Sequence, residues 1–200
     1  MALVKKLAGG KSQIGQDSFV LHILDYKKNG FYLEIGSAHP IEISNTYILE
    51  NSYAWKGVSV ELDPELYNLF ISERKQMCLN QDATKIQYAQ MLSRFKFPKI
   101  IDYLSIDIDP PRQSMQALLK VLKSGYEFSI ITFEHDLYLK KRNLYYKYFA
   151  RLVLKQKGYK LLVSNVANVK GKPQEDWYVR RGTKVLDNFP KNVPFSEFIQ

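Results

Sequence analysis

Patterns typical of strands alternate with patterns typical of helices along most of this 200-residue chain. Strand-like apolar runs occupy 31–35, 57–61, 77–79, 100–108 and 128–133. Helix-like stretches begin at Ser12 and Asp63 and cover 44–53, 85–94, 114–122 and 139–157. This alternation is typical of parallel strands joined by helical crossovers, and it disfavours all-α and all-β folds. Two further strand patterns, at 159–163 and 177–180, flank a loop with glycine and proline and predict an antiparallel hairpin at the end of an α/β sheet.

Length and composition predict a single domain over 1–200, with 1–11 as an N-terminal extension and 182–200 as an irregular tail. The chain is 46% hydrophobic and 24% charged, as ordinary globular domains are. Its one cysteine, Cys78, leaves no intramolecular disulfide and favours a reducing compartment. No apolar run suits a signal peptide or approaches the roughly 20 residues of a membrane span. We therefore expect a cytoplasmic protein.

Polar residues follow each of the five predicted parallel strands at the point where the strand ends. These segments are 34–39, 61–63, 80–83, 107–109 and 134–136. In open α/β sheets, ligands bind in the crevice beyond the carboxyl ends of the strands. A single acid at such a point often only caps the following helix. Five polar strand ends in succession predict a ligand site instead.

The first strand lacks the Gly-x-Gly-x-x-Gly motif that brings backbone close to a pyrophosphate, and this disfavours a nucleotide-using oxidoreductase. A ligand with ribose and adenine but no phosphate needs one glycine for close approach, an acid for the ribose and a polar group for the adenine edge. Gly36, Glu61 and Asp82 meet these needs in order. Glu61 is the strongest candidate because one carboxylate accepts hydrogen bonds from both ribose hydroxyls.

Several motifs together resemble the FkbM-type methyltransferases, which use S-adenosylmethionine. They are Ser12-Gln13-Ile14-Gly15-Gln16-Asp17, Gly30 to Pro40, Ser44-Asn45-Thr46-Tyr47, Trp55 to Glu61, Cys78 to Ala83, Asp102 to Asp109, Phe133-Glu134-His135 and Glu175 to Val179. The resemblance covers roughly 12–180. It implies a Rossmann-like class I methyltransferase sandwich, with a mostly parallel seven-stranded sheet that includes an antiparallel C-terminal hairpin strand.

The resemblance also assigns residues to the cofactor. Glu34, Gly36, Ser37 and Ala38 would line its methionine part, Glu61 its ribose and Asp82 its adenine, while Asp107 would face the methyl-transfer centre. The same motifs place His39, Thr46, Leu62, Asp63 and Ala83 in the cofactor site. His39-Pro40 stands where the family more often has Asp-Gly. In this respect the chain resembles a subgroup of the family that has His-Pro there. After the fourth strand, Asp109-Pro110-Pro111 replaces the Glu-Gly-type motif of the family. The family's acceptor-site residues therefore cannot be assigned directly to this chain.

The reaction expected from this resemblance is O-methylation of a sugar or another small hydroxylated acceptor. Such a transfer needs reactants in line and a base for the hydroxyl proton. His135, with Asp107 and Asp109, forms the predicted catalytic set, because histidine titrates near neutral pH; a histidine that only fixes its loop is the alternative. Asp107, Asp109 and Glu134 form a second alternative, a Mg²⁺ site that would bind sugar hydroxyls.

The net charge of +9 favours an anionic partner without identifying it. Between Asp136 and Glu175 the chain has no acid, and the basic residues there include Lys140, Lys147, Arg151, Lys155 and Lys160. A solvated helix face is the ordinary explanation of such a charge run. Because tyrosines interleave with the basic residues, an RNA-directed methyltransferase or a basic nucleic-acid-binding Rossmann-like module stays open as an alternative to a small-molecule or glycan acceptor.

Overall fold

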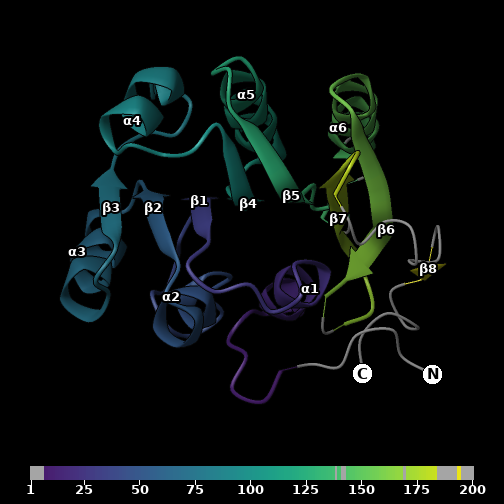
Figure 1. Cartoon of the computed structure of the whole chain (residues 1–200). Coiled ribbons are helices and arrows are strands. Elements are labelled where there is room, and N and C mark those ends of the chain that lie inside the picture. The colour runs from purple at the N-terminus through teal and green to yellow at the C-terminus, as the bar shows by residue number, and fades with distance from the viewer. Residues whose placement is uncertain (1–6, 138, 141–142, 169, 184–192, 195–200) are drawn as a thin grey trace.

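The computed structural model describes residues 7–137, 139–140, 143–168, 170–183 and 193–194, arranged as one sheet between two layers of helices (Figure 1). The strands are β1 Phe31–Ile35, β2 Lys56–Glu61, β3 Met77–Asn80, β4 Ile100–Ile106, β5 Glu127–Glu134, β6 Tyr159–Ala167, β7 Pro173–Arg180 and β8 Val193–Pro194. The helices are α1 Gln16–Ile23, α2 Tyr47–Tyr53, α3 Pro64–Glu73, α4 Tyr88–Arg94, α5 Pro111–Leu122 and α6 Leu144–Gln156.

The strand order is β3-β2-β1-β4-β5-β7-β6-β8. All neighbouring pairs from β3 to β5 are parallel. β7 is antiparallel to both of its neighbours, β5 and β6. This confirms the predicted mostly parallel seven-stranded sheet with an antiparallel C-terminal strand. The two-residue β8 adds a short parallel pairing beside β6.

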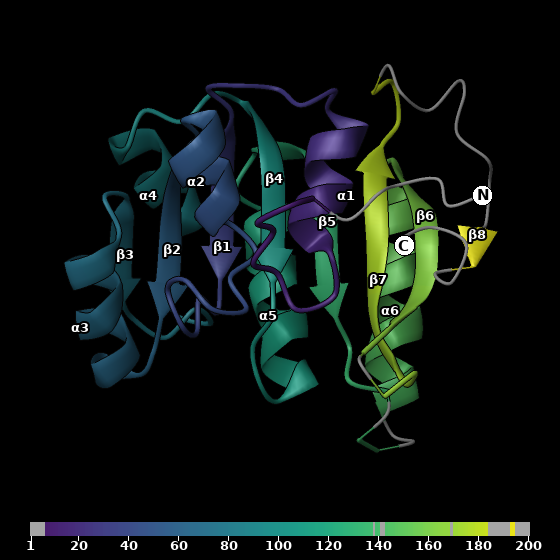
Figure 2. The ribbon, with the colours of Figure 1, turned by 90° about the horizontal axis from the view of Figure 1, so that it is seen from below.

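The two helical layers follow from the apolar residues that alternate across the strands. α1, α2 and α3 cover one face, and α4, α5 and α6 cover the other (Figures 1 and 2). Beneath α1, Phe19 stacks on Trp177 with ring centroids 4.6 Å apart, and Trp55 is also fully buried there. Within the described part of the chain, no helix is long and apolar enough to cross a membrane.

The strands β1 to β5 end at one edge of the sheet, which we call the carboxyl edge (Figure 2). β1 pairs with β2 on one side and with β4 on the other. The chain therefore reverses its order of strand addition beside β1, and this is the place where open α/β sheets hold their ligands.

Some element boundaries differ from those predicted. Ser12 does not cap the first helix; α1 begins after Gly15, and the Ser12 hydroxyl donates to Asp17 at 2.6 Å. Asp63 caps α3 as predicted, since its carboxylate accepts from two backbone N–H groups. The long basic helix begins at 144 instead of 139, and residues 141–142 lie outside the described ranges. The same holds for 1–6 of the predicted extension and for most of the predicted tail.

Candidate functional site

A cavity of about 240 Å³ opens at the carboxyl edge beside β1, β2, β3 and β4. Its walls come from the loops that follow these four strands and from the first turns of α3 and α5. The lining residues are Gly36, Ala38, Val60, Glu61, Leu62, Leu66, Gln81, Asp82, Ala83, Asp107, Ile108, Asp109 and Gln113. The structure thus brings together Gly36, Ala38, Glu61, Leu62, Asp82, Ala83 and Asp107 of the predicted cofactor residues.

Glu61, the last residue of β2, is held in place by the loops on both sides of it. One carboxylate oxygen accepts a hydrogen bond from the backbone N–H of Ala38 at 2.9 Å, and the other accepts from the N–H of Asp63 at 2.9 Å. Each carboxylate oxygen has a further lone pair. Two fixed oxygens with spare lone pairs can accept hydrogen bonds from a pair of neighbouring hydroxyls, such as those of a ribose.

The backbone fold requires a glycine at position 36. Its φ of +84° lies in the left-handed region, and a Cβ there would lie 1.9 Å from the backbone oxygen of Asp107. The close approach of β1 and β4 at their carboxyl ends therefore requires glycine at this position, independently of any ligand.

Asp82, beyond β3, offers a fixed anionic acceptor at another wall of the cavity. One of its oxygens accepts from the backbone N–H of Thr84 at 2.9 Å and from its hydroxyl at 2.7 Å. These hydrogen bonds from Thr84 lower the pKa of the Asp82 carboxyl. An ionised carboxylate here can accept a hydrogen bond from an exocyclic amine of a base.

The other predicted cofactor residues, Glu34, Ser37, His39, Thr46 and Asp63, do not line the cavity. The Glu34 carboxylate is buried and accepts from the hydroxyls of Thr46 at 2.9 Å and Ser59 at 2.6 Å. Its pKa is raised to about 7, chiefly by burial. His39 Nδ1 accepts from the backbone N–H of Glu42 at 3.0 Å, so this imidazole orients its own loop.

Arg74, which has no recognisable motif in the sequence, connects these buried groups to the loop that carries Gly36 and Ala38. Its side chain is 1% exposed and lies 2.6 Å from Glu50. The guanidinium also donates to four other oxygens of the first-strand region: Tyr32 Oη, Pro40 O, Ser44 Oγ and Thr46 Oγ1. Arg74 therefore fixes the path of the chain between β1 and α2.

Carboxylates gather next to the cavity, where β4 and β5 end and β7 begins. The side chains of Asp107 and Glu134 hydrogen-bond to each other, as do those of Asp109 and Asp136. Burial raises the pKa of both Asp107 and Glu134. Burial also raises the pKa of Asp136 to about 7 and that of Glu175 to about 8.

The predicted magnesium site is not found in this cluster. Across the described ranges, no group of three or more His, Cys, Asp or Glu side chains is arranged to hold a metal ion. Amide and indole groups satisfy the carboxylates instead: Gln174 donates to Glu134 at 2.6 Å, while Gln16 and Trp177 each donate to Glu175 at 2.7 Å.

His135, the predicted general base, lies outside the cavity. It is fully buried, its Nδ1 accepts from the backbone N–H of Leu137, and its Nε2 lies 3.7 Å from Asp176. Asp176 also binds Arg151 of α6 at 2.7 Å. Although burial alone would raise the pKa of Asp176, Arg151 and His135 lower it. The imidazole thus lies beside Asp176 of β7, which in turn binds Arg151, and a catalytic role for His135 stays a prediction.

Stability should fall as pH rises through neutrality. The folded-state pKa values of Glu34, Asp136 and Glu175 are all above the ordinary carboxyl value, so their contributions are complete below about pH 4.5 and are lost as pH rises to about 8. We expect the free energy of unfolding, measured by urea titration, to decrease by about 3 kcal/mol or more between pH 5 and pH 8.5.

Asp136→Asn supplies the matched control for this pH dependence. Asn also tolerates the left-handed φ of +45° at this position, and its amide can donate to Asp109 without carrying charge. The variant should lose less stability over the same pH range. Stability that rises with pH in the unaltered protein would contradict the prediction.

No protein-family model matches the sequence, and no curated protein does. The resemblance to FkbM-type enzymes therefore stays a prediction. Solved structures do match the fold. An O-methyltransferase from Bacillus cereus in complex with S-adenosylhomocysteine superposes with a TM-score of 0.63 at 14% identity, over 88% of this chain and 84% of that one. A putative O-methyltransferase from Klebsiella pneumoniae gives 0.61 at 13%, over 87% and 83%.

A putative rRNA methylase from Clostridium thermocellum matches as well, with a TM-score of 0.58 at 11% identity, over 86% of this chain and 97% of that one. Methyltransferases described for different acceptors thus share this arrangement of strands and helices. The chain has the Rossmann-like fold of the class I methyltransferases, and the comparisons leave its acceptor undetermined.

Proposed function

We propose that this protein is an S-adenosylmethionine-dependent methyltransferase that O-methylates a sugar or another small hydroxylated acceptor. The observation that carries the proposal is the cavity beside β1 with Glu61 fixed in its wall. Glu61 ends the second strand, and both of its oxygens are oriented by backbone N–H groups at 2.9 Å. This arrangement suits a ribose diol, and the fold is one that known methyltransferases share.

The residues around the cavity fit the parts of S-adenosylmethionine. Glu61 would hold the ribose hydroxyls, Asp82 and the neighbouring Ala83 would border the adenine, and the Gly36–Ala38 segment would border the methionine part. When bound, the cofactor supplies a methyl group on a sulfonium.

Asp107 is the residue that we assign to the acceptor proton. It lines the cavity and hydrogen-bonds to Glu134, and burial raises its pKa. A carboxylate with a raised pKa is a stronger base for a hydroxyl proton than an ordinary one. None of the residues that line the cavity is a lysine or an arginine that could bind a phosphate, which favours an uncharged polyhydroxylated acceptor over RNA.

Binding of S-adenosylhomocysteine, measured by calorimetry, tests the cofactor site. Replacing Glu61 with alanine removes two charge-assisted hydrogen bonds to the ribose, so we expect the dissociation constant to rise roughly 10- to 100-fold. Glu73→Ala is the control, because Glu73 is exposed at the far end of α3. No binding to the unaltered protein, or equal affinity of both variants, would refute the proposed site.

A further inference from the structure

The edge of the sheet opposite the cavity is basic. β1 to β6 all run in the same direction, so their amino ends lie together at this second edge. A lysine stands at or just before each of these six amino ends. We call the group the amino-end surface: Lys28 before β1, Lys56 at the start of β2, Lys75 before β3, Lys96 and Lys99 before β4, Lys123 before β5 and Lys157 before β6. All of these lysines are exposed.

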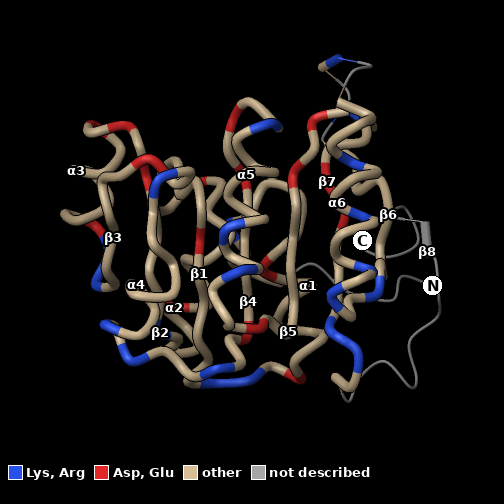
Figure 3. Tube along the Cα trace, turned by 90° about the horizontal axis from the view of Figure 1, so that it is seen from above, with Lys and Arg blue, Asp and Glu red and all other residues tan. Residues whose placement is uncertain are grey.

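Two exposed acidic residues, Asp25 and Glu73, lie near this surface and are outnumbered by its seven lysines. Asp102 is paired with Lys27 at 2.7 Å, and Glu127 is paired with Arg180 at 3.1 Å. None of the lysines of the amino-end surface has an ion-pair partner among the described residues. In Figure 3, red acidic segments gather where the parallel strands end, and blue segments gather at the opposite edge. The molecule is therefore polarised from one edge of the sheet to the other.

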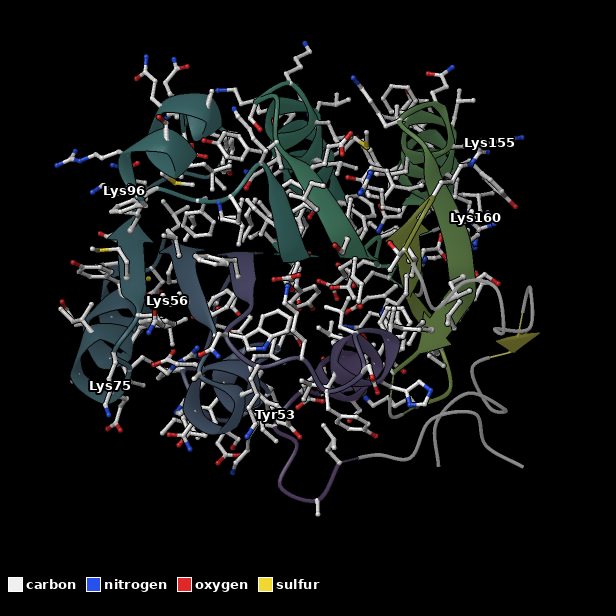
Figure 4. The ribbon with its side chains drawn as sticks, in the orientation of Figure 1. Tyr53, Lys56, Lys75, Lys96, Lys155 and Lys160 are labelled. Carbon is white, nitrogen blue, oxygen red and sulfur yellow. The ribbon has the colours of Figure 1, made fainter. Side chains whose placement is uncertain are left out.

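Exposed apolar side chains lie among these lysines. Tyr26 before β1, Met77 at the start of β3 and Ile100 at the start of β4 are 45%, 48% and 45% exposed. Figure 4 labels Lys56, Lys75 and Lys96 on the β2–β3 side of the molecule, and Lys155 and Lys160 on the β6 side. Basic residues thus extend across the whole width of the sheet, with separate apolar side chains between them.

We propose that the amino-end surface docks the protein onto an anionic lipid bilayer. Clustered lysines are attracted to the negative surface potential of anionic lipids, and interspersed apolar side chains insert at the headgroup level. The surface is broad, and its lysines come from loops at every strand, as contact with a planar partner requires. A bilayer in this position leaves the cavity at the opposite edge open to solvent.

A nucleic acid fits these observations less well. Its recognition favours arginine forks on phosphate and several aromatic side chains that stack on bases, whereas this surface presents lysines, Met77 and Ile100, with Tyr26 as the one aromatic among the exposed apolar side chains named above. A nucleic acid bound here would also lie at the edge away from the cavity. The inference concerns a surface that the proposed methyl transfer does not use, so each can fail without the other.

Co-sedimentation with lipid vesicles tests the proposal. The unaltered protein should sediment with phosphatidylcholine vesicles that contain phosphatidylserine and not with phosphatidylcholine alone. Reversing three charges in Lys56→Glu/Lys75→Glu/Lys96→Glu should weaken partitioning on the order of 100-fold at about 0.1 M salt. Circular dichroism checks that the variant is folded, as expected for exposed side chains.

The matched control reverses three charges at the other edge, in Arg112→Glu/Lys170→Glu/Lys172→Glu, and so has the same net charge. Its partitioning should change less than about threefold. Met77→Ser/Ile100→Ser should weaken the salt-resistant part of the binding. Equal losses in the two charge-reversal variants would show that net charge alone acts and would overturn the proposal. It would equally be overturned by no vesicle binding, or by binding to single-stranded RNA alone.

Discussion

Arg74→Met is expected to lower the free energy of unfolding by about 3–5 kcal/mol, the usual cost of removing one partner from a buried ion pair. The Arg74 side chain is 1% exposed, and its loss leaves the carboxylate of Glu50 without its cation. It also removes the hydrogen bonds that Arg74 donates to Tyr32 Oη and to two oxygens in the chain between β1 and α2. Methionine fills a volume similar to that of arginine. The decrease in the free energy of unfolding therefore reflects the lost polar contacts more than a new cavity.

Two further variants give this experiment its control. Arg94→Met changes an exposed arginine at the end of α4 and should alter stability by less than about 0.5 kcal/mol. Arg74→Lys keeps the charge but not the planar fork, so its loss should be intermediate. Trp55 and Trp177 are fully buried and report unfolding by fluorescence during a urea titration. A loss below about 1 kcal/mol in Arg74→Met would show that the network is not essential to the fold.

Asp107→Asn is expected to reduce the rate of methyl transfer by about 10² to 10⁴, as is usual for removal of a general base. Because Asp107 also lines the cavity, the affinity for S-adenosylhomocysteine should fall too, by less than about tenfold. The measurement is turnover of a hydroxylated sugar under saturating cofactor. A rate within threefold of the unaltered protein would exclude Asp107 as the base.

Glu134→Gln distinguishes a positioning role from a merely structural one. The Gln amide can donate to Asp107 and its oxygen can accept from Gln174, so both contacts stay satisfied. Because the hydrogen bond from Glu134 lowers the pKa of Asp107, the acidic limb of the pH–rate profile should stay in place in Glu134→Gln and move to higher pH in Glu134→Ala. His135→Asn, outside the cavity, should leave that profile in place.

The order of the elements could be predicted from the sequence because each strand in the sheet is a short apolar run flanked by helical patterns. The cavity position followed from topology, since all parallel strands end at one edge. The position of His135 outside this cavity could not be predicted in the same way. Glu134 ends β5 and accepts a hydrogen bond from Gln174, whereas His135 follows the strand and lies beside Asp176.

Other parts of the site depend on contacts between distant positions in the sequence, which no local pattern encodes. Gln16 and Glu175 lie 159 positions apart and hydrogen-bond at 2.7 Å. Arg74 follows the last residue of α3, and nothing in the neighbouring sequence distinguishes this buried arginine from an exposed one. The requirement for glycine at position 36 depends on the Asp107 backbone, which only the folded sheet brings close.

The antiparallel strand β7 has a consequence for the order in which the protein is made. β7 is the last of the seven principal strands to leave the ribosome, yet it lies between β5 and β6. A nascent chain must therefore keep those two strands apart until residues 173–180 emerge. Because Gln174 and Glu175 arrive with β7, the hydrogen bonds that join them to Glu134 and Gln16 form only after residues 173–180 have been made.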